Sequence, residues 1–345
     1  MSRIRFLLPQ VKTLPEGRPE QCPHCRGGLL QRHGLVSKPV KDLRESVVTA
    51  IRYRCTQCQR TFRHYPEGVD RHDQSQRLRA LVALSWALGL SHQSVSYLLV
   101  ALDASIAKMT SWRDVQEAGL GAARRLVLPE SVAVMGADET VLKVKGKQRV
   151  VGFVVEPESG EVLGFELLTQ QDSPAFIRWL KQYTQKLGVK VVVSDDLATY
   201  KPVVEELGVE HQVCLAHVSK NVKRRLKETV GWDKEKAQIG ELLKELPREG
   251  GLELLELEKA VRSAPKLREL VVDLAEKWRS LVCYRRNPGV PRTNNRTEQG
   301  IGRSKIRYKT LRGYKSEAGM MNGLYLTQWV WRPGEARDLS SLLAV

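Results

Sequence analysis

The sequence predicts a multidomain α/β protein in which a mixed sheet is preceded by a small metal-binding domain and a helical domain. Three observations support this prediction. Two Cys-x-x-Cys pairs lie near the N-terminus, amphipathic helical patterns follow, and strand and helix patterns in the order βββ-α-β-α-β begin beyond Pro129. A chain of 345 residues is long enough for two or three such domains.

Residues 1–70 are predicted to form a zinc ribbon. Four thiolates, from Cys22, Cys25, Cys55 and Cys58, suit a closed tetrahedral shell around one Zn²⁺. Such a shell leaves no open coordination position, so the ion would be structural. The alternative is that the cysteines are free. Six cysteines in all, four of them in these pairs, fit a reducing compartment better than a disulfide framework.

Residues 71–128 are predicted to form a helix-turn-helix domain. A helix ending at Gly89 is followed by a second helix with Ser91 as its N-cap, and then by a third helix with a polar face. The side chains expected to be exposed on that face are Lys108, Ser111, Arg113 and Gln116. Because the last helix of this motif enters the major groove, Lys108 and Arg113 are candidate DNA contacts. A plain three-helix bundle has the same periodicity and remains an alternative.

Residues 129–218 are predicted to form the first part of the sheet domain, and their βββ-α-β-α-β order matches the ribonuclease-H-like architecture. Asp138 falls inside the first strand pattern, and Asp195 and Asp196 end the fourth. Ligands collect at the carboxyl ends of parallel strands, and an acid inside an apolar strand is costly to bury unless it is paired or metal-bound. Each acid could instead be a strand-edge, turn or helix-cap residue.

Residues 219–290 are predicted to form a helical insertion in this core. Its beginning is basic, with Lys220, Lys223, Arg224, Arg225 and Lys227. This pattern is compatible with DNA contacts or with dimerisation, and the sequence does not rank the two. Just before the insertion, Cys214 and His217 form a Cys-x-x-His pair, for which we expect a structural or positioning role.

Residues 291–345 are predicted to contain the last core helix and a C-terminal tail. From Arg285 to Lys315 there are ten Lys or Arg and one acid, Glu298. Such a patch favours binding to a DNA backbone. The candidate contacts are Arg296, Arg303, Lys305, Arg307, Lys309, Arg312 and Lys315.

Glu298 has two interpretations. Its spacing from Asn295 is that of a capping box, so its carboxylate could reach back to the helix start. Alternatively, it joins Asp138 and Asp195 in a set of three carboxylates. Hard oxygen ligands of this kind can hold a pair of Mg²⁺ or Mn²⁺ ions that promote an in-line phosphoryl displacement.

The motifs ADET, VVSDDLATY and NNRTEQGIGRSKIRYKTLRGYKS resemble those of the DDE-superfamily transposases of bacterial insertion sequences. The N-terminal CPHC and YRCTQCQRTF are similar to a zinc ribbon that precedes a helix-turn-helix in several of them. The resemblance implies a catalytic Asp–Asp–Glu triad, formed by Asp138, Asp195 and Glu298, with two Mg²⁺ or Mn²⁺ ions. A Gly commonly follows the second acid, but this chain has Asp196 there, so the assignment stays open between the two neighbours.

The function implied by the resemblance is transposition: binding the terminal repeats of an insertion sequence, cutting the DNA and transferring the cut strand. The implied partners are double-stranded DNA, as element ends and as target, and further copies of the chain in a homodimer or higher oligomer. A catalytically silent DNA-binding regulator and a structure-selective nuclease of the same fold are the alternatives. A net charge of +17 and a pI near 9.7 also favour a polyanionic partner.

The sequence predicts no membrane partner and a bacterial cytoplasmic location, associated with the nucleoid when DNA is bound. No apolar run reaches the roughly 18 residues needed to span a bilayer. The N-terminal pattern is not that of a signal peptide.

Overall fold

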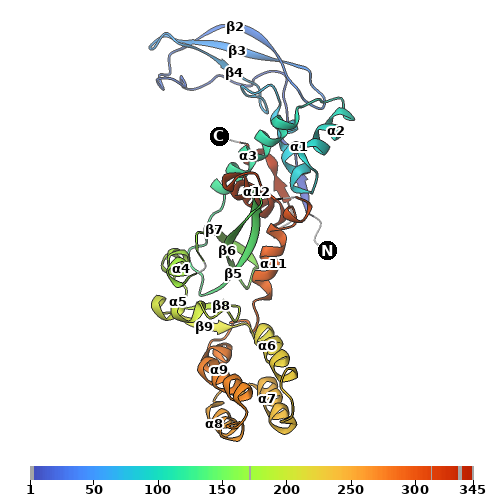
Figure 1. Ribbon diagram of the computed structural model, residues 1–345. Helices are drawn as coiled ribbons and strands as arrows, with labels where there is room; N and C mark the ends of the chain where they lie inside the picture. The colour runs from blue at the N-terminus through green and yellow to red at the C-terminus, as the bar shows by residue number, and fades with distance from the viewer. Residues whose placement is uncertain (1–3, 171, 312, 333–335, 344–345) are drawn as a thin grey trace. The chain divides into compact units, whose positions relative to one another are not determined.

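The computed structural model describes residues 4–170, 172–311, 313–332 and 336–343 (Figure 1). The chain divides into two compact units: a terminal unit, Met1–Leu126 with Arg303–Val345, and a central unit, Val127–Gly302. This division differs from the expected one, because the segment after residue 302 was grouped with the sheet domain. It belongs to the terminal unit because α12 (Glu317–Trp331) packs on α3 (Lys108–Arg124).

The first part of the terminal unit is a small antiparallel sheet of β2 (Leu30–Pro39), β3 (Val47–Cys55) and β4 (Thr61–His64). Its apolar cluster is limited to a few side chains around Leu30 and Tyr53, with Phe62 stacked on Tyr53 at a ring-centroid distance of 5.9 Å. A cluster of this size supplies little stabilisation by itself, and small domains of this kind depend on disulfides or metals.

The helical part of the terminal unit contains α1 (Gln76–Ala87), α2 (His92–Val100) and α3, together with α12. The predicted cap is present, because the Ser91 hydroxyl accepts the backbone N–H of Ser94 at 3.0 Å. Apolar residues of all four helices share one core. Two expectations about α3 were wrong: Ser111 is fully buried, and Gln116 is half-buried and accepts a hydrogen bond from Asn322. The strands β1 (Arg5–Leu7) and β10 (Ala336–Asp338) pair in parallel within this unit.

The central unit is built on a five-stranded sheet in the order β7-β6-β5-β8-β9. The strands β5 (Val134–Val144), β6 (Lys147–Glu156) and β7 (Glu161–Leu168) form the predicted antiparallel meander. The strands β8 (Val191–Ser194) and β9 (Glu210–Val213) are parallel to β5 and to each other. This mixed order, with the first strand in the middle, fits the ribonuclease-H-like core expected from the sequence.

Two helices, α4 (Ser173–Leu187) and α5 (Tyr200–Leu207), connect these strands and pack on the sheet. Asp172 caps α4 by accepting the N–H of Ala175 at 3.0 Å. Trp179 of α4 lies so close to Gly152 that a Cβ there would overlap the indole ring. Helix α4 therefore packs tightly against β6.

After β9 the chain forms the predicted helical insertion. It comprises α6 (Leu215–Lys227), α7 (Asp233–Glu245), α8 (Gly251–Ala260), α9 (Pro265–Leu281) and the short α10 (Cys283–Arg286). These helices share a hydrophobic cluster of their own, centred on leucine and valine side chains. The chain then returns in α11 (Asn295–Ser304), which carries Glu298. Among the described helices, none combines the length and apolar character that crossing a membrane requires.

Candidate active site

The register of β5 and β8 places Asp138 and Asp195 at the same level of the sheet. Gly136 of β5 lies opposite Val193 of β8 in a parallel pair. Side chains two residues further along each strand direction point to the same face, and these positions are Asp138 and Asp195. The β8–β9 pairing ends with Ser194 opposite Val213, so Asp195 stands at the carboxyl edge of this strand. Two carboxylates therefore converge at the edge where ligands of such sheets collect.

Electrostatic coupling between the carboxylates reflects this proximity. Burial first, and then the negative charges of Asp195 and Glu139, raise the pKa of Asp138 to about 7, with a smaller contribution from Glu298. The pKa of Asp195 is raised by burial first, while the backbone N–H of Leu197 and the nearby His217 oppose the rise. Charged carboxylates held this close repel one another, and a divalent cation would relieve the repulsion.

Glu298 reaches this edge because the start of α11 is fixed to β5 and to the start of α6. The Asn294 amide donates to the carbonyl of Ala137 at 3.0 Å, and the Asn294 backbone N–H donates to the Cys214 sulfur at 3.2 Å. A Cβ at Gly136 would overlap the hydroxyl of Thr297. Glycine at this position therefore allows α11 to approach the strand that carries Asp138.

The Cys-x-x-His pair contributes to the same arrangement. The Cys214 side chain is fully buried and holds the chain at Asn294, which is the residue before α11. His217 lies in the first turn of α6, and its Nε2 is 3.7 Å from a carboxylate oxygen of Glu298. The Glu298 carboxylate thus faces an imidazole beside Asp195, which favours the active-site interpretation of Glu298 over the capping-box one.

Asp196 has different surroundings from Asp195. Its carboxylate accepts a hydrogen bond from Lys277 of α9 at 2.8 Å and another from Asn221 of α6 at 3.2 Å. Lys277 also lies 3.0 Å from Asp273. Asp196 therefore ties the turn after β8 to the insertion, whereas Asp195 is coupled to Asp138. Of these two neighbours, Asp195 is the one whose charge acts on Asp138.

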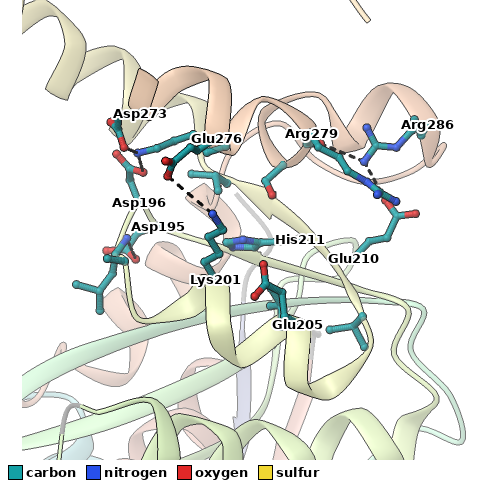
Figure 2. A pocket seen from close by; sticks show the side chains of 17 residues that line it. Asp195, Asp196, Lys201, Glu205, Glu210, His211, Asp273, Glu276, Arg279 and Arg286 are labelled. Carbon is teal, nitrogen blue, oxygen red and sulfur yellow. Dashed lines mark hydrogen bonds and ion pairs between the residues drawn. The ribbon is translucent and has the colours of Figure 1, made fainter. Parts of the chain in front are cut away.

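Beside these two aspartates lies a cavity of about 530 Å³ between the core and α9 (Figure 2). Lys201 of α5 extends toward Glu276 of α9, at 3.9 Å, and His211 lies on its β9 wall. His211 Nε2 is 2.8 Å from the Ser194 hydroxyl, and burial lowers the pKa of His211 to about 4. The neutral His211 ring and Ser194 form a buried polar contact directly beneath the turn that carries Asp195.

The sequence did not single out Glu139 and Tyr200 as part of this site. The fully buried Tyr200 donates its hydroxyl proton to Glu139 at 3.0 Å. Burial, and then the charge of Asp195, raises the pKa of Glu139. The sequence does place Glu139 next to Asp138 in ADET, and Tyr200 shortly after Asp195 and Asp196 in LATY. It gives no indication, however, that the hydroxyl of Tyr200 contacts the carboxylate of Glu139.

A divalent-cation site formed by the three acids would differ from a single-ion cluster. In the described part of the chain, the only group of three or more potential ligands whose atoms all lie within 4.8 Å of one another is the four-cysteine group. Two ions roughly 3.5–4 Å apart, each about 2.1 Å from its ligands, would accept carboxylate oxygens up to about 8 Å apart. The donor set of three carboxylates suits Mg²⁺ or Mn²⁺.

The four-cysteine group fits Zn²⁺ closely. The sulfur atoms of Cys22 and Cys58 are 3.7 Å apart, and those of Cys25 and Cys55 are 3.6 Å apart. A tetrahedral shell with Zn–S bonds of about 2.3 Å requires S···S separations of about 3.8 Å. The backbone N–H of Cys58, followed by that of Gln57, lowers the pKa of the Cys55 thiol to about 7, whereas burial and the neighbouring thiols raise the pKa of Cys25 to about 11. The Zn²⁺ assignment therefore rests on the positions of the four sulfur atoms.

The basic side chains predicted to bind DNA differ in exposure. Lys108, Arg113, Arg296, Lys309 and Lys315 are exposed, and Arg303 and Lys305 are half-buried. Arg312 lies outside the described residues.

Arg307 is a correction. It is only 1% exposed, lies 4.8 Å from the centre of the Trp86 ring and donates to the carbonyl of Leu90 at 2.8 Å. Burial lowers its pKa to about 10. Arg307 therefore stabilises the packing of its segment on the helical core of the terminal unit and is not free to contact DNA.

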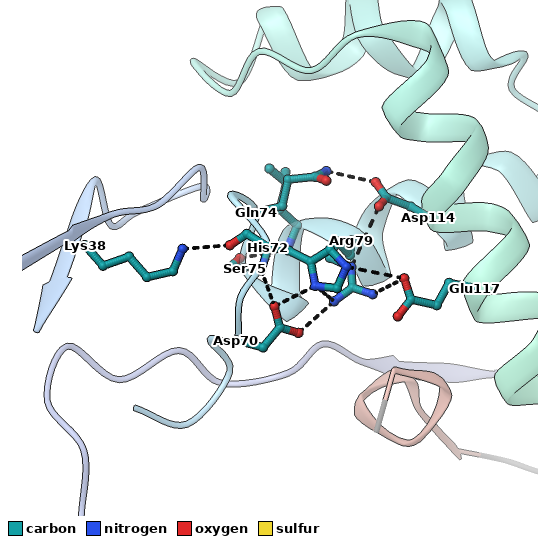
Figure 3. Close-up of polar contacts among 9 residues, drawn as sticks. Lys38, Asp70, His72, Gln74, Ser75, Arg79, Asp114 and Glu117 are labelled. Atoms are coloured by element: carbon teal, nitrogen blue, oxygen red, sulfur yellow. Dashed lines mark hydrogen bonds and ion pairs between the residues drawn. The ribbon is translucent and has the colours of Figure 1, made fainter. Parts of the chain in front are cut away.

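A second polar cluster in the terminal unit has a structural role (Figure 3). The guanidinium of Arg79 is fully buried on α1, where it donates to Asp70 at 2.9 Å and pairs with Glu117 of α3. Asp114, also on α3, accepts the Gln74 amide at 2.8 Å, and burial raises its pKa to about 6. This cluster joins the segment after the small sheet to two helices of the bundle.

The acid cluster predicts a pH dependence for the protein in the absence of Mg²⁺ and Mn²⁺. The pKa of Asp138 is about 7 in the folded state and about 3.9 in an unfolded chain, so the folded state binds this proton more tightly. The resulting stabilisation is fully present below about pH 4 and is lost as the pH rises through about 7, with an upper limit of about 4 kcal/mol. We expect the urea midpoint of the wild type to fall more between pH 5 and pH 8 than that of Asp138→Asn, which has no charge to gain. Equal falls in the two proteins would contradict the coupling.

Comparisons with known proteins add the following findings. No protein-family model matches the chain, and no curated protein matches it. One similar solved structure is the HTLV-2 integrase catalytic core domain in complex with magnesium, in a dimeric form. It has 18% identity and a TM-score of 0.22, and the match covers 30% of this chain and 74% of that one. Another is the catalytic core domain of BIV integrase, with 13% identity, a TM-score of 0.21, and coverage of 51% and 99%. The site is therefore interpreted from its own geometry.

Proposed function

We propose that this chain is a DNA transposase of the metal-dependent Asp–Asp–Glu type, which binds the ends of an insertion sequence, cuts the DNA and transfers the cut strand. The observation that carries the proposal is the convergence of Asp138, Asp195 and Glu298, from three segments far apart in the sequence, at the carboxyl edge of one sheet. A helix cap or a turn would require only one such acid, whereas electrostatic coupling of all three suits a site that binds cations beside a phosphodiester.

In the proposed reaction the three carboxylates bind the cations, and Asn294, Cys214 and Gly136 hold Glu298 in position to do so. Two bound Mg²⁺ or Mn²⁺ ions would activate the attacking oxygen and stabilise the leaving one. Water is the attacking group for cutting, and the released 3′ hydroxyl is the attacking group for strand transfer. His217, beside Glu298 and Asp195, is placed to orient the third carboxylate.

The DNA partner is supported by charge. The chain carries a net charge of +17, and the exposed side chains of Lys108, Arg113, Arg296, Lys309 and Lys315 are available to phosphates. In this proposal the zinc ribbon and the helices of the terminal unit recognise the terminal repeats. Two ends must be cut for one transfer, so we propose that a homodimer or a larger assembly acts on DNA.

The proposal is tested with the purified protein and a DNA duplex that contains the sequence flanking its gene, with Mg²⁺, with Mn²⁺ and with neither ion added. We expect Mn²⁺-dependent nicks at defined positions in the flanking sequence and, with a target plasmid added, joined products. Cutting of any duplex at unrelated positions would instead identify a structure-selective nuclease. Sequence-specific binding with no cutting in either divalent ion would identify a DNA-binding regulator, and both outcomes would overturn the transposase proposal.

A further inference from the structure

One edge of α6 is attached to the acids around the candidate site. His217, Asn221 and Arg225 follow one another at four-residue spacing, so they lie on one side of the helix. Their partners are Glu298 at 3.7 Å, Asp196 at 3.2 Å and Asp273 at 3.4 Å, respectively. These contacts fix the position of α6 relative to Asp195 and Glu298 within the central unit.

The adjoining edge of α6 is buried in the insertion. Leu215, Val218 and Val222 belong to the hydrophobic cluster that α6 shares with α7, α8 and α9. A helix held along two edges cannot rotate about its axis, so its remaining face has a defined direction. That face is available for a third interaction.

The remaining face carries a row of lysines, which we call the α6 lysine row: Lys220, Lys223 and Lys227. All three are exposed, and no carboxylate pairs with them among the contacts of the described residues. Their neighbour Arg224 is paired with Glu228 at 3.1 Å. A shallow groove of about 760 Å³ follows this face from Ala216 to Glu228, lined by the row.

Like charges three and four residues apart on a helix are slightly destabilising. The other basic residues of this helix have carboxylate partners, because Arg225 pairs with Glu269 at 3.2 Å as well as with Asp273. The lysine row is the part of α6 whose charge the fold does not neutralise.

We propose that the α6 lysine row binds the phosphate backbone of the DNA duplex whose scissile phosphate lies at Asp138, Asp195 and Glu298; this role rests on the proposed function. From Lys220 to Lys227 the helix rises about 10 Å, a length over which a duplex presents about three phosphates of one strand. The row begins one turn after His217, so it continues directly from the acids.

The sequence left DNA contacts and dimerisation open for this segment. The charge of the α6 lysine row favours DNA binding over self-association. In a two-fold dimer through this face, the same patch would meet itself. Three unpaired lysines would then oppose three others, and like charges across an interface disfavour association. A polyanion, in contrast, would neutralise the row.

The test measures DNA binding and does not require cutting. The triple variant Lys220→Gln, Lys223→Gln, Lys227→Gln is compared with a matched control, Lys234→Gln, Lys244→Gln, Lys259→Gln. The control makes the same change in net charge at exposed positions of α7 and α8 in the same insertion. Fluorescence anisotropy gives the Kd for a labelled duplex of about 30 base pairs between about 50 and 300 mM NaCl, without added Mg²⁺ or Mn²⁺. Unfolding midpoints establish that each variant is folded.

Each phosphate contact contributes about 0.9 to the slope of log K against log salt for a duplex, so we expect the slope of the α6 variant to fall in magnitude by about 2.7. At 0.1 M salt this corresponds to at most about a 500-fold weaker Kd, whereas the control should change the slope by less than about 0.9. Equal slopes in wild type and α6 variant, or equal losses in both triples, would overturn the proposal. A change in the mass of the free protein with an unchanged slope would instead identify a self-association surface.

The result is independent of catalysis. A reduced slope in a protein that cuts no DNA would support the lysine row while overturning the transposase proposal. Normal Mn²⁺-dependent cutting with an unchanged slope would overturn the lysine row alone.

Discussion

Substitution of Asp138 by asparagine is expected to abolish DNA cutting, with a rate loss of roughly 10³-fold or more, as is common when one member of a catalytic group is removed. Asparagine preserves the size of the side chain but has no charge with which to bind a divalent cation. Burial first, then the charges of Asp195 and Glu139, and then that of Glu298 raise the pKa of Asp138 to about 7, so Asp138 lies close to these acids. The measurement is the single-turnover rate of nicking on the flanking-DNA duplex with Mn²⁺.

The control for this prediction is Glu161→Gln, which removes an exposed acid at the start of β7. Its rate should remain within about twofold of the wild type, since surface substitutions rarely have large effects. Asp195→Asn should match Asp138→Asn, while Asp196→Asn should retain more activity because Asp196 bonds to Lys277 and Asn221. Cutting at the wild-type rate by Asp138→Asn would contradict the proposed mechanism. If Asp196→Asn lost all activity while Asp195→Asn kept it, the second acid would be Asp196.

Much of the core could be predicted from local patterns. The alternation of residues 134–168, the helix starting at Ser173 and the short apolar run before Asp195 each encode an element through neighbours in the chain. For this order of elements, the rules for connections between strands allow only a few strand orders in the sheet. The strand order observed places Asp138 and Asp195 close together.

The position of Glu298 could not be predicted in the same way. It depends on Asn294 meeting Cys214 and Ala137, and on Gly136 providing space for Thr297. These contacts join residues that are far apart in sequence, and nothing in the local pattern around any of them indicates its partner. As the one acid in a basic stretch, Glu298 was already a candidate beside Asp138 and Asp195. The family resemblance pointed to the same residue, but neither observation indicates what holds it in place.

The number of basic residues in a segment does not indicate which of them are exposed and able to contact DNA. In the segment from Arg292 to Lys315, Arg307 has the same sequence signature as Lys309, yet one is buried against Trp86 and the other is exposed. A cation can be buried when an aromatic ring and backbone carbonyls replace its water shell. Similarly, the sequence pattern predicts that Lys277 is an ordinary exposed helix residue. In the structure it forms ion pairs with Asp196 and Asp273, and so connects α9 to the turn beside Asp195.

Removal of Zn²⁺ is expected to unfold the small sheet of β2, β3 and β4. Structural zinc supplies about 10–16 kcal/mol of folding free energy in zinc-finger peptides, and the apolar cluster around Leu30 and Tyr53 is too small to replace it. With a strong chelator, or in Cys55→Ser, residues 22–64 should lose hydrogen-exchange protection. The amides of β5 and β8 should keep theirs, because the central unit has a separate core.

The control is Cys283→Ser, which alters a buried thiol of α10 that hydrogen-bonds to Glu210 in the central unit. Elemental analysis should find one zinc per chain in the wild type and in Cys283→Ser, and none in Cys55→Ser. The S···S separations of 3.7 and 3.6 Å already match those of a ZnS₄ shell, so little rearrangement is needed for binding. Protection of residues 22–64 from hydrogen exchange with no zinc bound would contradict this prediction. The close positions of the four thiols would then result from packing alone, and other interactions would stabilise the sheet.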